Sequence, residues 1–244
     1  MDSKICLLDV ETSPIICYTW GVHEVDAVKV IKPWHLLTFA YKWLGDKKTT
    51  VLSNNPDYPT DDLMLCKAIR KVLDEADIIV AQNGNAFDIP RINTRFLVHG
   101  IAPPSPYKKI DTLKVARHVF AFSSNKLDDL GKSLDEGGKL RHRGFQMWED
   151  CLAGNKRAWA EMKKYNAKDV ELLERIYIRM RPWMRNHPHT GFKDKTCPKC
   201  GSSKLKMNGH NMQMTGLYQR FQCLSCFGYC GWKVDSKREL LRNA

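Results

Sequence analysis

Two acidic residues stand at the end of an apolar run near the start of the chain. Asp9 and Glu11 follow the run Ile-Cys-Leu-Leu at residues 5–8 and are separated by one valine. Positions i and i+2 of a strand point to the same side, so a buried strand here places both carboxylates on one face. Close carboxylates resist ionising together, and a divalent cation with oxygen ligands, such as Mg²⁺ or Mn²⁺, relieves that repulsion. The pattern therefore favours a strand that ends at a metal site, although a strand ending in solvated acids fits the same residues.

The composition indicates a globular protein. The 244 residues, 43% hydrophobic and 27% charged, suit one medium domain plus a small appendage. The apolar runs are too short to span a bilayer, and the first residues lack a signal-peptide pattern. We therefore expect an intracellular, cytoplasmic protein with no membrane partner, and a prokaryotic or viral origin is compatible with this.

The positive charge is unevenly distributed. The net charge is +12, and residues 193–244 carry ten Lys or Arg against three Asp or Glu, a net charge of +7. A basic excess of this size suggests a polyanionic partner, most simply nucleic acid. A merely solvated basic surface is the alternative.

The hydrophobic pattern predicts an α/β fold. Strands are expected at residues 5–10, 36–43, 49–52 and 78–81, and helices at 61–75, 87–99, 111–120, 126–134 and 155–181. Asp61 or Asp62 is the expected N-cap of the first helix, and Gly100 ends the second. Strands followed by more helices indicate a mixed sheet flanked by helices.

Two further segments carry acidic residues in constrained positions. Asp88 ends the segment Asn83-Gly-Asn-Ala-Phe-Asp, which follows a predicted strand and precedes a predicted helix. Aspartate is common at the N-cap of a helix, so an ordinary cap is the alternative to a functional role. Tyr165 and Asp169 are i and i+4 on the longest predicted helix and share its apolar face with Leu172. An aspartate on a buried stripe is costly unless it is paired or binds a metal.

The order of these three motifs resembles the 3′→5′ exonucleases with a ribonuclease H-like fold and four catalytic acids. The tyrosine makes the chain most similar to the DEDDy subgroup, which includes the proofreading domains of family B DNA polymerases. The resemblance covers roughly residues 4–185. It implies a ribonuclease H-like sheet and a metal-dependent nuclease. Such domains are often fused to a polymerase, and the remaining chain is too short for one, so a stand-alone nuclease or a subunit acting in trans is expected.

The resemblance also implies roles for individual residues. Asp9, Glu11, Asp88 and Asp169 match the four carboxylates that bind two catalytic Mg²⁺ or Mn²⁺ ions, and Tyr165 matches the residue that orients the attacking water. Thr12 and Asn83 fall where the family contacts the terminal nucleotide or supports the site.

Two C-x-x-C pairs mark the C-terminal part of the chain. Cys197 and Cys200 are separated from Cys223 and Cys226 by 22 residues, a spacing typical of tetrahedral structural Zn²⁺. The segment looks like a zinc ribbon, with Cys230 as an alternative fourth ligand, and paired disulfides are disfavoured without a secretory signal. We therefore predict a nuclease domain at 1–185, a linker at 186–196 and a zinc ribbon at 197–244. His210 is expected to be a loop residue rather than a ligand.

The aromatic residues of the ribbon have two interpretations. Aromatic side chains with interleaved cations form a stacking platform for single-stranded nucleic acid. They equally suit the small core of the ribbon itself. The set comprises Tyr218, Phe221, Phe227, Tyr229 and Trp232.

The sequence thus predicts a metal-dependent 3′→5′ exonuclease that releases nucleoside monophosphates from single-stranded nucleic acid. DNA is favoured over RNA through the resemblance to proofreading domains. An exoribonuclease is one alternative, and a nucleic-acid-binding adaptor with a silent nuclease fold is another. A polymerase or another replication or repair protein is a candidate partner in trans.

Overall fold

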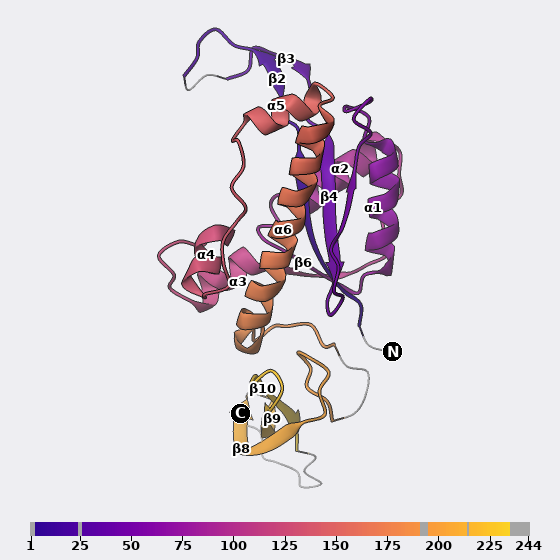
Figure 1. The fold of residues 1–244 in the computed structure, drawn as a ribbon. Coiled ribbons are helices and arrows are strands. Elements are labelled where there is room, and N and C mark those ends of the chain that lie inside the picture. Colours follow the sequence, from indigo (N-terminus) through magenta and orange to yellow (C-terminus); the bar gives the residue numbers. More distant parts are fainter. Residues whose placement is uncertain (1–2, 24–25, 191–194, 214, 235–244) are drawn as a thin grey trace. The chain divides into compact units, whose positions relative to one another are not determined.

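The computed structural model describes residues 3–23, 26–190, 195–213 and 215–234. The chain divides into two compact units (Figure 1): Lys4–Tyr177, and Ile178–Ala244 together with Met1–Ser3. The predicted domain limits at 185, 186–196 and 197 stay predictions. Part of the predicted linker (191–194) and the end of the predicted ribbon (235–244) lie outside the described residues.

A five-stranded mixed sheet forms the centre of the first unit. Its strand order is β5-β4-β1-β6-β7, antiparallel from β5 to β1 and parallel from β1 to β7. The strands are β1 (Ile5–Thr12), β4 (Leu36–Trp43), β5 (Thr50–Ser53), β6 (Ile78–Ala81) and β7 (Lys108–Asp111). This confirms the mixed sheet predicted from the sequence.

The sheet is covered on both faces (Figure 1). The helices are α1 (Leu63–Glu75), α2 (Asp88–Val98), α3 (Thr112–Val119), α4 (Leu127–Ser133), α5 (Gln146–Leu152) and α6 (Lys156–Met180). Alternate β1 residues such as Leu8 and Val10 pack with the apolar faces of α1 and α2. On the opposite face, Leu37 of β4 packs with Trp159, Met162 and Tyr165 of α6. Asp9 and Glu11 therefore face α6, since neighbouring residues of a strand alternate between faces.

Four elements of the first unit were not predicted from the sequence. They are β2 (Ile16–Tyr18), β3 (Lys29–Lys32), β7 and α5. The strands β2 and β3 form a separate two-stranded hairpin whose residues are largely exposed, so they lack an alternation of apolar and polar residues. The first two residues of β7 are exposed lysines, and only the last two residues are buried, so the sequence shows no apolar run that would predict a strand.

The C-terminal unit contains a three-stranded antiparallel sheet in the order β10-β9-β8. The strands are β8 (Leu205–Gln213), β9 (Gly216–Cys223) and β10 (Tyr229–Lys233), preceded by the 3₁₀ helix η1 (Arg181–Trp183). No helix among the described residues is long and apolar enough to cross a membrane.

Candidate active site

Three of the predicted acids meet between β1 and α6. A carboxylate oxygen from each of Asp9, Glu11 and Asp169 lies within 4.8 Å of the others. The first two come from the end of β1 and the third from the middle of α6, more than 150 residues later in the chain. The structure thus brings together residues that the sequence could only place on separate elements.

Asp88 approaches the same group from the first residue of α2. Its side chain is 1% exposed, and Oδ1 accepts a hydrogen bond from the backbone nitrogen of Val10 at 3.0 Å. Asp88 is not part of the 4.8 Å group, although its charge acts on Asp9. The N-cap residue of α2 is Phe87, so the bland interpretation of Asp88 as a cap does not hold.

A tight turn positions Asp88. Asn83 has a left-handed φ of 61°, which asparagine tolerates better than most residues. At Gly84 a Cβ atom would lie 2.4 Å from the Cβ of Ala81, so any larger residue forces the turn away from β6. The carboxylate of Asp111 accepts hydrogen bonds from the backbone nitrogens of Asn83 and Asn85 at 3.0 and 3.1 Å. These contacts hold the segment that leads into α2.

Asn166 is a residue of the site that the sequence analysis missed. Its Nδ2 donates to Oδ2 of Asp9 at 2.6 Å, and its Oδ1 accepts from Oγ1 of Thr38 at 3.0 Å. Asn166 and Thr38 are fully buried. This chain of hydrogen bonds fixes the orientation of the Asp9 carboxylate. In the sequence, Asn166 is only a polar residue beside Tyr165. Its burial, which marks it as part of the site, is visible only in the structure.

Lys139 is a second residue that was missed. Its ammonium group donates to Oδ2 of Asp169 and, at 3.1 Å, to the hydroxyl oxygen of Tyr165. Its backbone nitrogen donates to Oδ1 of Asp128 at 2.7 Å, which anchors the loop after α4. The sequence shows only a lysine after two glycines in an irregular segment, and that pattern carries no functional signal.

The acids of the site hold their protons more tightly than free carboxylates. Burial, followed by repulsion from Asp169, raises the pKa of Glu11 to about 8. Burial raises the pKa of Asp88 to about 7. Burial and then the charges of Asp88 and Glu11 raise the pKa of Asp9 as well. Burial also raises the pKa of Tyr165 to about 12, so its hydroxyl stays protonated at neutral pH.

The donor set fits a divalent cation. Oδ1 of Asp169 is buried and has no hydrogen-bond partner. A buried polar atom without a partner costs free energy because it has lost its hydration, and a crowded group of carboxylates costs free energy because like charges repel. A bound Mg²⁺ or Mn²⁺ would remove both costs, since both ions take oxygen ligands.

Two clefts lie near the acids, one lined by Asp9 itself and the other by Thr12, the residue after Glu11. One, of about 590 Å³, is lined by Asp9, Asn83 and the cations Arg117, Lys126 and Lys139. The other, of about 480 Å³, is lined by Thr12 and by an aromatic group that includes Trp34, His142, Phe145 and Trp148. The ring of His142 lies edge-on to Tyr165 with centroids 4.8 Å apart. Thr12 and Asn83 therefore line different clefts.

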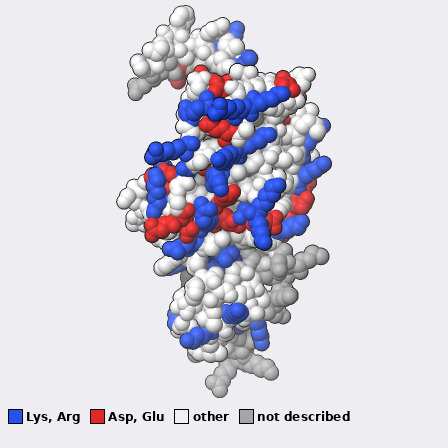
Figure 2. All heavy atoms as spheres, in the orientation of Figure 1, with Lys and Arg blue, Asp and Glu red and all other residues white. Residues whose placement is uncertain are grey.

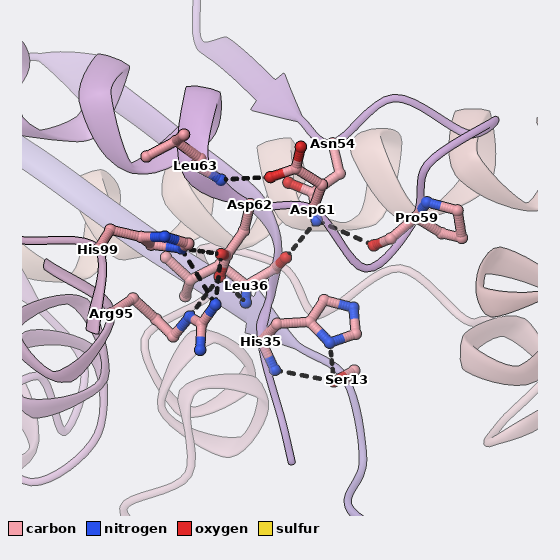
Figure 3. A network of polar contacts seen from close by, with 10 residues as sticks. All are labelled: Ser13, His35, Leu36, Asn54, Pro59, Asp61, Asp62, Leu63, Arg95 and His99. Atoms are coloured by element: carbon pink, nitrogen blue, oxygen red, sulfur yellow. Dashed lines mark hydrogen bonds and ion pairs between the residues drawn. The ribbon is translucent and has the colours of Figure 1, made fainter. Parts of the chain in front are cut away.

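A buried polar network holds the strand ends next to the site (Figure 3). The carboxylate of Asp62 accepts hydrogen bonds from Nε and Nη2 of Arg95, both at 2.7 Å, and from the backbone nitrogen of Leu36 at 2.9 Å. Its Oδ1 also lies 2.6 Å from Nε2 of His99. His35 pairs with the Ser13 hydroxyl at 3.0 Å.

This network has a structural role rather than a metal-binding one. Ligand atoms of Asp62, Cys66 and His99 also lie within 4.8 Å of one another. Both Asp62 oxygens, however, already accept hydrogen bonds from Arg95. Burial raises the pKa of Asp62, but the hydrogen bonds from Arg95 and His99 outweigh this effect and lower the pKa. Asp62 occupies the N-cap position of α1 but makes no capping hydrogen bond, because its side chain is used here instead. The adjacent Asp61 accepts from the backbone nitrogen of Leu63 at 3.0 Å.

The four predicted zinc ligands come together in the C-terminal unit. The sulfurs of Cys197 and Cys226 are 3.7 Å apart, and those of Cys200 and Cys223 are 3.6 Å apart. All four lie within 4.8 Å of one another, a group that does not include Cys230. None of the nine cysteines forms a disulfide. The arrangement suits one tetrahedral Zn²⁺, with Cys226 as the fourth ligand. His210 lies on β8, not in a loop, and is also outside the group.

Comparison with known proteins places the first unit in a family. A family profile of the RNase H superfamily matches residues 31–181, and the chain belongs to this superfamily. The structure of the family B DNA polymerase from the hyperthermophilic archaeon Pyrobaculum calidifontis is similar, with a TM-score of 0.52 at 12% identity. The match covers 74% of this chain and 25% of the polymerase, so the chain spans about a quarter of that protein. A search of curated proteins found no match.

These comparisons confirm the predicted fold family. They support a nuclease that cleaves phosphodiester bonds with the help of divalent metal ions, and hence a nucleic-acid substrate. The likeness to the polymerase is one of fold, because the identity is low.

Proposed function

We propose that this protein is a metal-dependent 3′→5′ exonuclease that acts on single-stranded nucleic acid, with DNA favoured, and releases nucleoside monophosphates. The observation that carries the proposal is the meeting of Asp9, Glu11 and Asp169 within 4.8 Å, with the Tyr165 hydroxyl and Asp88 beside them. The order of these residues along the chain matches the exonucleases described above.

The four acids would hold two Mg²⁺ or Mn²⁺ ions. Two such ions, when bound, activate a water for attack on the phosphorus and stabilise the leaving 3′ oxygen. Asn166 fixes Asp9, and the backbone of Val10 fixes Asp88, so both carboxylates are oriented before substrate arrives. Preorganised groups of this kind need no rearrangement during the reaction.

Tyr165 orients the attacking water rather than removing its proton. A phenol whose pKa is raised to about 12 is a poor base at neutral pH. Its hydroxyl already lies 3.1 Å from Nζ of Lys139, so the two groups form a polar pair next to Asp169. Lys139 supplies a positive charge where the phosphate of the substrate carries negative charge.

The two clefts suit two parts of a single strand. Arg117 and Lys126 are exposed cations on the side of Asn83 and fit the phosphates. Trp34 and Trp148 on the side of Thr12 fit an unstacked base. We assign Thr12 and Asn83 to substrate contacts on this basis.

Two alternatives remain as outcomes of the same test. An exoribonuclease would contact the 2′-hydroxyl of each nucleotide. An adaptor would bind strands without cleaving them. The unpartnered oxygen of Asp169 favours an enzyme, since an adaptor has no need for that costly group.

The test is a degradation assay on single strands of identical sequence in DNA and RNA. Each strand carries a 5′ label, and a parallel set has a blocked 3′ end. We expect a ladder that shortens from the 3′ end with Mg²⁺ or Mn²⁺ and no cleavage with EDTA. Asp9→Ala and Asp88→Ala should abolish cleavage, while Asp150→Asn, a surface acid paired with Arg143, should not. Cleavage of the 3′-blocked strand, or by either alanine variant, would contradict the proposal.

A further inference from the structure

The ribbon sheet has two chemically different faces. Burial alternates along β10, where Tyr229, Gly231 and Lys233 are exposed and the residues between them are half-buried. Directly paired residues of an antiparallel sheet point to the same side. The pairing of β10 with β9 and of β9 with β8 therefore assigns each side chain to one of two faces.

One face is used by the ribbon itself. The rings of Phe221 and Trp232 stack with centroids 4.1 Å apart, and both side chains are half-buried. Cys223 lies on the same face as Phe221, two residues further along β9, and belongs to the buried cysteine cluster. Phe221 and Trp232 therefore cover part of each other's surface, on the face of the sheet opposite Tyr229.

The opposite face carries cations and tyrosines, and we call it the basic face. Its larger side chains, besides Asn211, are those of Lys206, Tyr218, Arg220, Gln222, Tyr229 and Lys233. Lys206 and Tyr229 both pair with Gln222, Lys233 pairs with Tyr218, and Arg220 pairs with Gly231.

Two features prepare the basic face for a ligand. The Arg220 guanidinium lies 5.9 Å from the Tyr229 ring centroid, and its Nε donates to the Asn208 carbonyl at 2.7 Å. Arg220 is thus held beside an aromatic ring that is 51% exposed. Opposite Arg220, Gly231 has no side chain, so β10 leaves the sheet uncovered between Tyr229 and Lys233.

The charge around this face has one sign. Residues 195–234 contain Lys195, Lys199, Lys204, Lys206, Arg220 and Lys233 and no Asp or Glu. In Figure 2 the visible side of the C-terminal unit carries a few separate blue side chains among white residues. Residues 195–234 therefore offer these cations no carboxylate to pair with, and such cations attract a polyanion.

We propose that the basic face binds single-stranded nucleic acid, with bases stacked on Tyr229 and Tyr218 and phosphates on Lys206, Arg220 and Lys233. Exposed aromatic rings bind unpaired bases of any sequence, and adjacent cations bind the backbone. A double strand hides its base faces, so the aromatic residues select single strands. The surface belongs to the C-terminal unit alone and goes beyond the proposed nuclease activity.

The test measures binding of the full chain to fluorescent 30-nucleotide strands of dT and rU, without added Mg²⁺ or Mn²⁺, at several salt concentrations. Tyr229→Ala and Arg220→Ala alter the basic face. Phe227→Ala removes an aromatic residue that is 67% exposed elsewhere in the ribbon, and Lys195→Ala removes an exposed cation that lies outside the three strands. These two variants are matched controls, and zinc content verifies that each ribbon is folded.

We expect Tyr229→Ala to weaken binding by about 5-fold or more, the range found for stacked aromatic residues. Arg220→Ala should weaken binding and reduce the slope of log affinity against log salt by about 0.7, the value for one phosphate contact on a single strand. Both controls should stay within about 2-fold of the wild type, well below the effect of losing one stacked base.

Equal losses in the face variants and their controls would overturn the proposal in favour of a diffuse basic surface. Binding of a polyglutamate peptide as tight as that of the strands would overturn it in favour of an acidic protein partner. Cleavage of the p-nitrophenyl ester of thymidine monophosphate, a substrate too small to reach a second surface, reports on the nuclease site separately. A failure of the basic face is thereby distinguished from a failure of the proposed activity.

Discussion

Lys139 donates a hydrogen bond to Asp169, so a cation from the loop after α4 neutralises an acid whose side chain is 2% exposed. Burial disfavours the ammonium, but the carboxylate raises the pKa of Lys139 above its usual value. The Lys139 charge also offsets part of the repulsion that Asp9 and Glu11 experience from the other acids. A metal ion bound by Asp169 would compete with Lys139 for the same carboxylate.

Lys139→Met should therefore destabilise the metal-free protein at pH 8. We expect the free energy of unfolding to fall by about 1–3 kcal/mol, the range for a lost hydrogen bond to a charged group. Mn²⁺ should then raise the melting temperature of the variant more than that of the wild type, because Asp169 is no longer shared. Thermal unfolding with and without Mn²⁺ measures both effects. Lys132→Met, which removes an exposed partner of Asp128, is the control, and an unchanged Lys139→Met would refute the prediction.

Tyr165→Phe should separate catalysis from metal binding. The ring stays in its contacts with His142 and Trp148, and only the hydroxyl is lost. We expect kcat to fall by about 10²-fold, the low end for groups that handle or position a proton. Mn²⁺ affinity should change little, because the four acids remain. Tyr107→Phe, in the core beside α1 and α2, is the matched control. A loss as complete as that of Asp9→Ala would mean that Tyr165 does more than orient water.

Glu11→Gln should stabilise the metal-free protein at alkaline pH. The folded-state pKa of Glu11 is about 8, against an ordinary value of 4.5. Between these values the folded protein holds a proton that the unfolded chain releases, so the wild-type free energy of unfolding falls as pH rises through this window. Glutamine does not titrate and avoids this loss.

The melting temperature of Glu11→Gln should exceed that of the wild type by a few degrees at pH 8, and the difference should vanish near pH 4. Saturating Mn²⁺ should reverse the order at pH 8, because only glutamate offers a charged ligand. A difference that is independent of pH would show that Glu11 is ionised in the metal-free protein.

Cys197→Ser should release zinc, whereas Cys230→Ser should keep it. The Cys197 sulfur belongs to the group of four, and that of Cys230 lies outside it. A small three-stranded sheet cannot bury much apolar surface, so loss of the metal should unfold the ribbon. The first unit has its own core and should stay folded, and cleavage of very short strands should persist. Zinc content and activity on a short strand measure both effects. Retained zinc in Cys197→Ser, or lost zinc in Cys230→Ser, would contradict the assignment.

Much of the fold could be predicted because its signals are local. The runs at residues 36–43 and 78–81 became β4 and β6 with the same bounds, since a buried strand needs a continuous apolar segment. The 3.6-residue pattern of α6 was equally clear. The hairpin of β2 and β3 could not be predicted, because its residues are mostly exposed and lack a periodic pattern.

The candidate site was predictable only where spacing carries the information. Asp9 and Glu11 had to share a face of β1, and Tyr165 and Asp169 had to share a face of α6. The two C-x-x-C pairs likewise had to present their sulfurs together for a metal. The relationships within β1, within α6 and within each cysteine pair depend on residues no more than four positions apart.

The sequence alone determined which chemical groups are present, which secondary structures carry them, and that a basic, cysteine-rich segment follows the acidic motifs. The tertiary structure alone decided that Lys139 pairs with Asp169, that Asn166 orients Asp9, and that Asp62 serves a buried network instead of a helix cap. It also decided that Phe221 and Tyr229 lie on opposite faces of one sheet. The physical reason is that hydrogen bonds and burial depend on distances between segments far apart in the chain, and no local pattern encodes those distances.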